Sequence, residues 1–365
     1  MIKLGLYTQH MDEFGLTGPN VYQTNLIKHL SSRNDIDLYL IHYRKNENNP
    51  FYRNNNNILI PKTPLIGELA TRKYDLDIIH FNYIPWEFRS FFFLLKQKKI
   101  ATSHISVDWN SQIKWENHAH IRSFIEPLNA KLLDKIIAVS ENLKFRLIKY
   151  LKVPESKIKV VYEGINREIF RELKDSEYVY LKDKYSFKKP FIIHVSNFSI
   201  RKNPRILFQT FKRLLQNGYE GDLVLVGFGW LNPISNRLLN ILGIQDRVKI
   251  MGYVPIKKLA ELLNMAQVAF FPSLHENFCF PIVEAMACGT PVVASKAYSI
   301  PEIAGDAAIL NDSNDDKSFF NNINSILEND SLNEQMKKSG LENSKRFSWE
   351  KCVQETISIY KKILS

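Results

Sequence analysis

The sequence has little glycine, little cysteine and no long apolar run. Glycine makes up 14 of 365 residues, about half the usual share, so each retained glycine is informative. The three cysteines (Cys279, Cys288 and Cys352) are too few for a disulfide framework and lack CxxC metal spacing, which predicts a reducing compartment. No run approaches the roughly 18 apolar residues that cross a bilayer. Met1–Tyr7 is too short for a signal peptide, so we expect a cytoplasmic protein.

The composition favours a globular protein with a moderately basic surface. Hydrophobic residues make up 45% and aromatic residues 12% of the chain, which excludes disorder, collagen-like repeats and coiled coil. The length predicts two domains, since each would have roughly 100–200 residues. The net charge is +11, and its larger part lies in residues 1–172 (25 Lys and Arg against 18 Asp and Glu). That excess suits an anionic membrane surface or lipid carrier.

Short apolar runs alternate with segments of helical period throughout the chain. Continuous apolar strands separated by helices are typical of parallel sheets covered on both faces. Two such series predict an α/β protein with two doubly wound, Rossmann-like domains. The expected strands are 2–7, 36–42, 76–81, 99–104, 136–140, 158–162, 191–196, 223–227, 248–252, 268–271, 291–295 and 307–310. The expected helices are 18–32, 86–97, 117–133, 141–151, 203–217, 255–265, 280–288, 317–328 and 331–345.

A charged stretch of little strand character, Arg171–Lys189, predicts the seam between the domains. We therefore expect domains at 1–172 and 173–346, followed by a C-terminal segment, 347–365, with a helix that carries an apolar stripe. Asn54–Asn57 is interpreted as a polar loop tip.

Two glutamates dominate the most informative segment, which runs from Ser273 to Ala294. Glu276 is expected in a loop after a buried strand, and Glu284 about one turn inside the following helix. Both can then face the carboxyl edge of the sheet, where open α/β sheets bind ligands. Carboxylates accept hydrogen bonds from vicinal hydroxyls, and a helix N-terminus favours phosphate. Taken alone, the pair also fits a solvated loop glutamate and a helix ion pair.

Three further elements lie at expected strand ends. Arg201 and Lys202 follow a strand and suit a diphosphate, or are plain surface cations. Gly15 and Gly18 precede the first helix and permit close approach to a ligand, or form an ordinary turn. His104 closes a strand, where a histidine is often structural.

The segment Glu276…Glu284 followed by Ala-Met-Ala-Cys-Gly-Thr-Pro-Val-Val-Ala resembles the signature of family 4 glycosyltransferases, the retaining GT-B group also described as glycosyl transferases group 1. The resemblance covers nearly the whole chain. It implies two Rossmann-like domains facing a cleft, the first for the acceptor and the second for the nucleotide sugar, with the C-terminal helix crossing back to the first domain.

The resemblance also implies roles for individual residues. Glu284 would hold the donor ribose, Glu276 would meet sugar hydroxyls, and Lys202 with Arg201 would balance the leaving diphosphate. The implied neighbours of the donor are Asn277, Phe278, Cys279, Asn197, Gly18 and His104. The chain departs from the family at three of its positions: Cys279 stands for a usual glycine, Asn197 for a frequent arginine, and Glu163 for a usual asparagine.

The resemblance implies a retaining hexosyltransferase that uses neither a metal ion nor a cofactor. It would move a hexose to a saccharide or lipid-linked saccharide, and the favoured donor is GDP-mannose. UDP-linked glucose, galactose or N-acetylhexosamine remain open as donors. A nucleotide-sugar epimerase or a sugar-binding module is the alternative of another class. Gly227-Phe228-Gly229 lacks the third glycine of a dinucleotide fingerprint. We expect no nucleic-acid partner.

Overall fold

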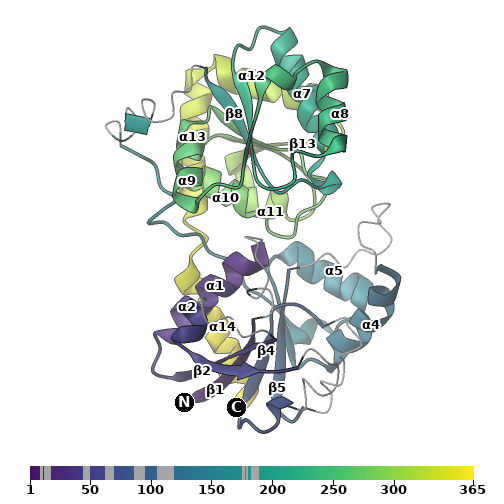
Figure 1. The fold of residues 1–365 in the computed structure, drawn as a ribbon, viewed down its shortest axis with the longest axis vertical. Coiled ribbons are helices and arrows are strands. Elements are labelled where there is room, and N and C mark those ends of the chain that lie inside the picture. The colour runs from purple at the N-terminus through teal and green to yellow at the C-terminus, as the bar shows by residue number, and fades with distance from the viewer. Residues whose placement is uncertain are drawn as a thin grey trace. The chain divides into compact units, whose positions relative to one another are not determined.

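A computed structural model describes residues 1–8, 11, 18–43, 50–61, 70–85, 95–104, 119–174, 177, 180–181 and 189–365, with residues 119–124 as backbone alone. The chain forms two compact units (Figure 1). Met1–Gly164 and Ser348–Ser365 make up unit 1, and Ile165–Phe347 makes up unit 2. Both termini therefore belong to unit 1.

Unit 1 contains a seven-stranded sheet in the order β3-β2-β1-β4-β5-β6-β7. All of its strand pairs are parallel. Its strands are β1 (Ile2–Tyr7), β2 (Ile36–His42), β3 (Asn56–Leu59), β4 (Ile78–Phe81), β5 (Lys98–Ser103), β6 (Lys135–Ala138) and β7 (Ile158–Val160). Its helices are α1 (Gly18–Ser31), α2 (Pro50–Arg53), α4 (Ala119–Leu132), α5 (Glu141–Leu151), the 3-10 turn η3 (Glu155–Lys157) and α14 (Trp349–Leu364).

The strand β3 corrects one expectation from the sequence. Asn56 and Asn57, expected in a loop tip, pair with Tyr39 and Leu40 of β2 at the sheet edge. Most side chains of β3 are exposed, so its sequence shows no apolar alternation. As an edge strand it is held in the sheet by backbone hydrogen bonds to β2. The expected helix 86–97 falls largely on residues 86–94, outside the described residues, as does Gly15.

Helix α14 is joined to unit 1 through buried polar and backbone contacts. Tyr360 OH lies 2.6 Å from Nδ1 of His80 on β4, and Nε2 of His80 lies 2.8 Å from the hydroxyl of Thr102 on β5. Gly164 fits where no other residue would, since an added Cβ would lie 2.2 Å from the backbone nitrogen of Trp349. The helix packs beside α1 (Figure 1). Its apolar stripe, including Val353 and Ile357, is buried.

Unit 2 contains a six-stranded parallel sheet in the order β10-β9-β8-β11-β12-β13. Its strands are β8 (Phe191–Val195), β9 (Asp222–Val226), β10 (Val248–Gly252), β11 (Val268–Phe271), β12 (Val292–Ser295) and β13 (Ala308–Asn311). Its helices are α7 (Pro204–Gln216), α8 (Pro233–Leu242), α9 (Ile256–Met265), α10 (Phe280–Ala287), α11 (Ile300–Ala304), α12 (Asp316–Glu328) and α13 (Asp330–Ser344). Three 3-10 turns complete it: η4 (Ile200–Lys202), η5 (Gln245–Arg247) and η6 (Gly305–Ala307).

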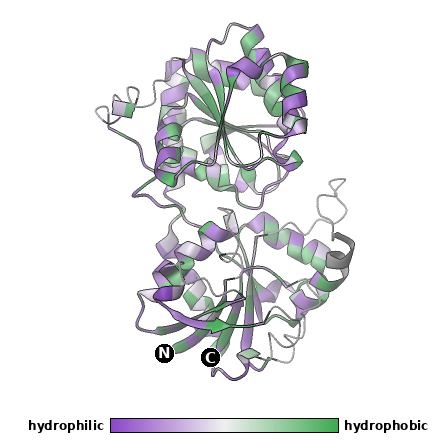
Figure 2. Ribbon diagram, viewed as in Figure 1, coloured by the Kyte–Doolittle hydropathy of each residue, from purple (hydrophilic) through white to green (hydrophobic). Residues whose placement is uncertain are grey.

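The sheet of unit 2 is buried on both faces, as its apolar strands predict. Hydrophobic residues run through the centre of the sheet in Figure 2. Phe208 and Phe211 from α7 and Phe319 from α12 are fully buried in one cluster that includes Trp230. Aromatic and aliphatic burial of this kind contributes about 25 cal/mol per Å². This packed core supports the loops at the edge of the sheet.

The boundary between the units differs from the expected one at residue 172. Unit 2 begins at Ile165, before the charged stretch. Asn264 of α9 accepts a hydrogen bond from the Leu173 amide at 2.9 Å and donates one to the Arg171 carbonyl at 3.0 Å. These contacts attach the stretch to unit 2, although its composition is polar. Within the described residues, no helix is both long and apolar enough to span a membrane.

Candidate functional site

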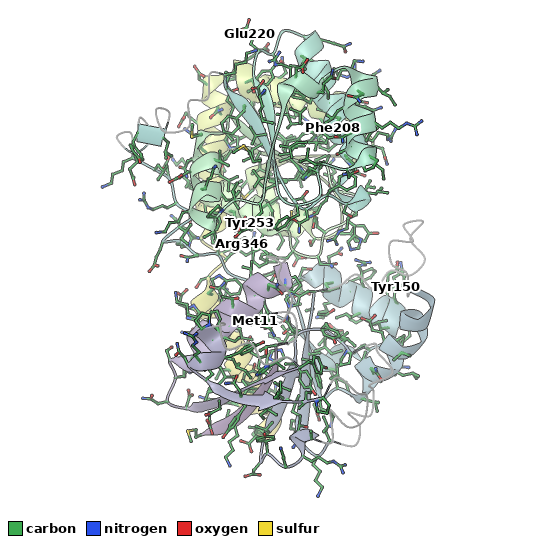
Figure 3. The ribbon with its side chains drawn as sticks, in the orientation of Figure 1. Met11, Tyr150, Phe208, Glu220, Tyr253 and Arg346 are labelled. Atoms are coloured by element: carbon green, nitrogen blue, oxygen red, sulfur yellow. The ribbon has the colours of Figure 1, made fainter. Side chains whose placement is uncertain are left out.

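The candidate site of unit 2 lies where the strand order reverses. The chain runs from β8 outward to β9 and β10, and then returns to place β11 on the other side of β8. The segments that follow β8 and β11 therefore separate at the carboxyl edge, which creates a crevice in doubly wound sheets. In Figure 3, Tyr253, which follows β10, lies at the opposite end of unit 2 from Glu220, which precedes β9. Tyr253 thus belongs to the carboxyl edge.

Lys202 and Glu276 meet across this reversal point. Lys202 ends η4, after β8, and its Nζ lies 2.6 Å from Oε1 of Glu276 in the loop after β11. Ser273 donates a second hydrogen bond to the same oxygen at 2.8 Å. The side chains are 13% and 7% exposed, respectively. The sequence analysis had named Lys202 and Glu276 separately, and the structure brings them into contact.

The pKa of Glu276 reports two opposing effects. Burial would raise the pKa of this carboxyl, but the charges of Lys202 and Arg201 and the hydrogen bonds from Lys202 and Ser273 hold it below its ordinary value. Glu276 is therefore an ionised, buried carboxylate beside an ammonium group. Such a pair keeps a cation in place inside a low-dielectric site.

Backbone and side-chain hydrogen bonds fix the loops that carry this pair. The Leu274 amide donates to the Arg201 carbonyl at 2.7 Å, which joins the two loops directly. Ser299 donates through its hydroxyl to the Glu276 carbonyl at 3.0 Å. Buried Asn203, in the left-handed region at φ 58°, donates to the carbonyl oxygens of Pro272 and Ser313. The charged pair therefore sits on a rigid support.

Glu284 lies in α10 and is buried, and among the described residues no charge stabilises its carboxylate. Burial alone raises the pKa of its carboxyl from an ordinary 4.5 to about 8. The residue is 9% exposed. Among the described residues, no hydrogen bond or ion pair to this carboxyl occurs. A buried acceptor of this kind is satisfied when a ligand brings donors to it.

The start of α10 provides backbone groups at the same edge. Cys279 occupies the N-cap position with φ 73° and ψ 65°, a left-handed conformation that favours glycine, and its side chain is 7% exposed. The Phe278 ring is buried edge-to-face against Phe280 and Phe347, so only its backbone is left to meet a ligand. The Asn277 amide oxygen lies 3.2 Å from Nε2 of His275.

Asn197 supports a neighbouring loop. Its Oδ1 accepts a hydrogen bond from the Phe228 amide at 2.9 Å, which ties the segment after β8 to the segment after β9. Gly227 allows this approach, since an added Cβ would lie 2.1 Å from the Ser196 carbonyl oxygen. Because its oxygen is engaged by the backbone, Asn197 acts here as a loop support.

An exposed aromatic pair stands beside that loop and was missed by the sequence analysis. The rings of Phe228 and Tyr253 stack with centroids 5.3 Å apart and an interplanar angle of 5°. They are 51% and 44% exposed, respectively. Their signal in the sequence was the position of each next to a glycine at the end of a strand, Gly227 and Gly252. Large exposed aromatic surfaces on rigid loops are typical of binding sites.

His104 and Gly18 belong to a second cluster, in unit 1. His104 follows β5, and its Nε2 lies 3.2 Å from Oδ1 of Asn82. Asn82 donates through Nδ2 to the carbonyl of Pro19, the residue after Gly18, at 3.3 Å. The Oε1 atom of buried Glu163 lies 3.3 Å from Nδ1 of His104. Asn82 thus links His104 to Pro19, which follows Gly18 in the chain.

The predicted site residues therefore form two groups. Lys202, Arg201, Glu276, Glu284, Asn277, Phe278, Cys279 and Asn197 belong to the carboxyl edge of unit 2, while His104 and Gly18 belong to unit 1. His194, near Lys202, is structural: Nδ1 bonds the Phe270 carbonyl, Nε2 bonds Ser196, and burial lowers the pKa of the ring to about 4.

Comparison with known proteins gives matches in both halves of the chain. Residues 17–169 match the family described as Glycosyltransferase Family 4, and residues 181–343 match Glycosyl transferases group 1. The chain is 30% identical over 243 residues to O-antigen chain mannosyltransferase B from Escherichia coli, a match that covers 66% of this chain and 63% of that protein. It thus spans less than two thirds of that relative's length. An uncharacterized glycosyltransferase from Methanocaldococcus jannaschii is 25% identical over 95% of both chains.

Solved structures share the complete fold. Sucrose-phosphate synthase from Thermosynechococcus elongatus matches with a TM-score of 0.83 at 20% identity, covering 100% of this chain and 99% of that one. HepE from Anabaena in complex with UDP-glucose matches with a TM-score of 0.81 at 17% identity, covering 99% and 100%. With two parallel Rossmann-like sheets, a paired lysine and glutamate at a sheet reversal point, and family matches across both units, the chain belongs to the family 4 glycosyltransferases and has their GT-B fold.

Proposed function

We propose that this glycosyltransferase moves a hexose from a nucleotide-diphosphate sugar, GDP-mannose, to a saccharide or lipid-linked saccharide in surface glycan biosynthesis. One observation carries the proposal: the Lys202–Glu276 pair and Glu284, whose carboxyl has no partner among the described residues, lie on segments that border the same reversal point of unit 2. The arrangement offers a cation for a diphosphate and an acceptor for hydroxyls, the two chemical features of a nucleotide sugar.

Lys202 and Arg201 are the groups suited to the departing diphosphate. Negative charge grows on that group as the bond to the anomeric carbon breaks, and preorganised cations stabilise it. Glu276 holds the Lys202 ammonium at 2.6 Å and thereby fixes its position. The backbone amides at the start of α10 supply further donors. We propose that these groups act without a metal ion, so that activity in excess EDTA remains unchanged.

Glu284 is suited to the ribose of the donor. Two hydroxyls on adjacent carbons can donate to the two oxygens of one carboxylate. These bonds favour the ionised form, so the pKa of about 8 in the free protein falls when the donor binds. The stacked pair Phe228 and Tyr253 presents an open aromatic face for the base.

We propose that the anomeric configuration is retained without a covalent intermediate on the protein. Glu276 is engaged by Lys202 and Ser273, and Glu284 is assigned to the ribose, so neither is placed as a nucleophile. We propose front-face attack, in which the departing phosphate oxygen takes the proton of the acceptor hydroxyl. The new glycosidic bond then forms on the face that the diphosphate leaves.

Two observations bear on the donor. The mannosyltransferase from Escherichia coli is a 30% identical relative, which supports mannose. HepE, which shares the fold, was solved with UDP-glucose, so a UDP-hexose is the second candidate. The acceptor surface is proposed for unit 1, where the basic excess would suit a lipid-linked or membrane-bound saccharide. Co-sedimentation with anionic vesicles that weakens as salt is raised would support that contact.

Slow donor hydrolysis provides the test. The purified protein is incubated with GDP-mannose, UDP-glucose, UDP-galactose and UDP-N-acetylglucosamine, and release of the nucleoside diphosphate is followed. Release from GDP-mannose alone supports the proposal, whereas release from one UDP-sugar assigns the second candidate. If no donor is hydrolysed and none raises the melting temperature, the protein is not a transferase for these donors. Binding without transfer would indicate a sugar-binding module, and conversion of one nucleotide sugar into another would indicate an epimerase.

A further inference from the structure

Helix α8 carries an apolar stripe on its exposed side. Ile234 and Ile241 are 50% and 67% exposed, and Leu231, in the turn before the helix, is 78% exposed. Because Ile234 and Ile241 are seven positions apart, they lie on one side of the helix, about 10 Å apart along its axis. The other side of the helix is buried through Ser235 and Leu239. We call Leu231, Ile234 and Ile241 the α8 stripe.

The turn that presents Leu231 is fixed by the residues on either side of it. Trp230 is fully buried and donates through Nε1 to the Ser196 carbonyl at 2.7 Å. Asn232 caps α8, because its Oδ1 accepts hydrogen bonds from two amides of the first helical turn at 2.9 and 3.0 Å. An apolar group held on a fixed backbone loses little conformational entropy when it binds, which favours a role in binding.

Exposed hydrophobic side chains are concentrated around this stripe. Of the fourteen large ones among the described residues, six lie between residues 228 and 256. Besides the stripe they are Phe228, Tyr253 and Ile256. The stacked rings of Phe228 and Tyr253 join the turn before α8 to the loop before α9. A concentration of exposed apolar side chains marks a contact with a partner or with a membrane.

The charges in the same part of the chain are almost all positive. Residues 223–260 contain five lysines and arginines but a single carboxylate, Asp246, which follows α8 in η5. Exposed Arg237 lies on α8 within the stripe, and exposed Lys257 lies in the first turn of α9. Cations beside exposed aliphatic groups complement a surface that is anionic outside and apolar beneath. A bilayer of acidic lipids is such a surface.

We propose that the α8 stripe and its neighbouring cations dock unit 2 on a membrane surface of anionic lipids. The three aliphatic side chains enter the boundary between headgroups and acyl chains, and Arg237 and Lys257 meet lipid phosphates. The ten-residue helix lies along the interface, since it is far too short to span a bilayer. The inference goes beyond the proposed function, because hydrolysis of a donor in solution requires no membrane.

A fluorophore placed on the stripe provides the direct test. The three cysteines (Cys279, Cys288 and Cys352) are buried, so an introduced surface cysteine is labelled selectively. We expect an environment-sensitive fluorophore on Leu231→Cys to shift to the blue with vesicles of phosphatidylcholine and phosphatidylglycerol. Lipids brominated in the acyl chain should quench it. Lys338→Cys, on α13 at the opposite side of unit 2 from α8 (Figure 1), should show neither effect. An unchanged probe at position 231 would overturn the proposal.

Co-sedimentation of the full-length protein with the same vesicles gives the second readout. The double variant Leu231→Ser with Ile234→Ser should bind at least about ten-fold more weakly, because two aliphatic side chains lose their burial. Arg237→Gln should bind about five-fold more weakly, and binding should fall as salt is raised. Leu128→Ser, on α4 of unit 1, is the matched control, since Leu128 is 63% exposed. Equal binding of the double variant, or equal binding to phosphatidylcholine alone, would contradict the proposal.

Other occupants of the stripe give different results. A dimer in light scattering that Leu231→Ser converts to a monomer would assign the stripe to a second copy of the chain and overturn the proposal. Loss of vesicle binding in Leu128→Ser alone would assign the contact to unit 1, with the same consequence. Thermal melting of each variant checks that both units remain folded.

The test also separates this inference from the proposed function. The Leu231 and Ile234 double variant should hydrolyse the donor in solution as the wild type does. If the donor panel is silent while the probe at position 231 enters the bilayer, the transfer function fails and the docking surface stands. If a donor is turned over but the probe does not respond, the docking surface fails and the function stands.

Discussion

The ammonium of Lys202 lies 2.6 Å from Oε1 of Glu276, and the two residues come from segments that follow β8 and β11, neighbours at the point where the strand order reverses. The carboxylate balances the positive charge of the lysine. A bound diphosphate would compete with Glu276 for the same cation.

Replacing Lys202 should reduce turnover more than affinity. We expect Lys202→Ala to lower kcat by 10²–10³-fold, because the cation acts where charge develops in the transition state. Steady-state kinetics on the donor identified by the panel would measure this. Lys212→Ala, on the neighbouring helix α7, serves as a control and should leave kcat unchanged. Full activity of Lys202→Ala would remove the lysine from the mechanism.

Glu284 should release a proton when the donor binds. At pH 7 its carboxyl, with a pKa of about 8, is mostly protonated, and two hydrogen bonds from ribose hydroxyls would favour the ionised form. We expect about one proton to be released per bound donor, measured by titration calorimetry in buffers of different ionisation enthalpy. Glu284→Gln should abolish the release and raise the donor KM. The exposed Glu328→Gln is the control, and release that persists in Glu284→Gln would contradict the assignment.

The same carboxyl should make stability fall with rising pH. Between about pH 4.5 and 8 the folded protein holds a proton on Glu284 that the unfolded chain has lost, so the free energy of unfolding decreases through this window. Glu284→Gln lacks the titrating group. We expect the free energy of unfolding of the variant, minus that of the wild type, to increase by about 4 kcal/mol at most between pH 5 and pH 8. Urea unfolding at the two pH values measures the difference, and a constant difference would exclude the burial effect.

The aromatic pair should contribute to donor affinity. Removing one ring from Phe228 or Tyr253 takes away stacking worth about 0.5–1.5 kcal/mol beyond area burial. We therefore expect either alanine variant to raise the donor KM up to about ten-fold with little change in kcat. Leu231→Ala, 78% exposed in the segment after Phe228, is the control. Equal affinity of all three variants would show that the pair does not meet the base.

The bond between His80 and Tyr360 should stabilise unit 1. Tyr360→Phe leaves Nδ1 of buried His80 without its partner at 2.6 Å, at a cost of about 1–3 kcal/mol. The adjacent Lys361→Ala removes only a surface pair with Asp35, 3.0 Å apart, worth at most about 1 kcal/mol. Chemical unfolding of both variants measures the comparison. A smaller effect for Tyr360→Phe than for Lys361→Ala would show that this bond does not hold α14.

The sequence alone determined the elements that depend on local pattern. The apolar strands of both sheets and most of the helices followed from periodicity, because strands buried on both faces need continuous apolar residues. The segment from Glu276 to Ala294, taken as a whole, resembled the signature of the family before any contact was known. The short edge strand β3 did not follow, since pairing to β2 is made by backbone groups that any residue provides.

Only the tertiary structure decided which polar residues meet. Lys202 and Glu276 are 74 positions apart, and the contact arises because β8 and β11 are neighbours in the sheet. The contact of Asn82 and Glu163 with His104 likewise depends on the strand order of unit 1. Phe228 and Tyr253 stack because two glycine-containing turns end at one edge. Sequence pattern indicates burial and local conformation. The chemistry of a site depends on contacts between residues that are far apart in the sequence, and these contacts form only when the chain folds.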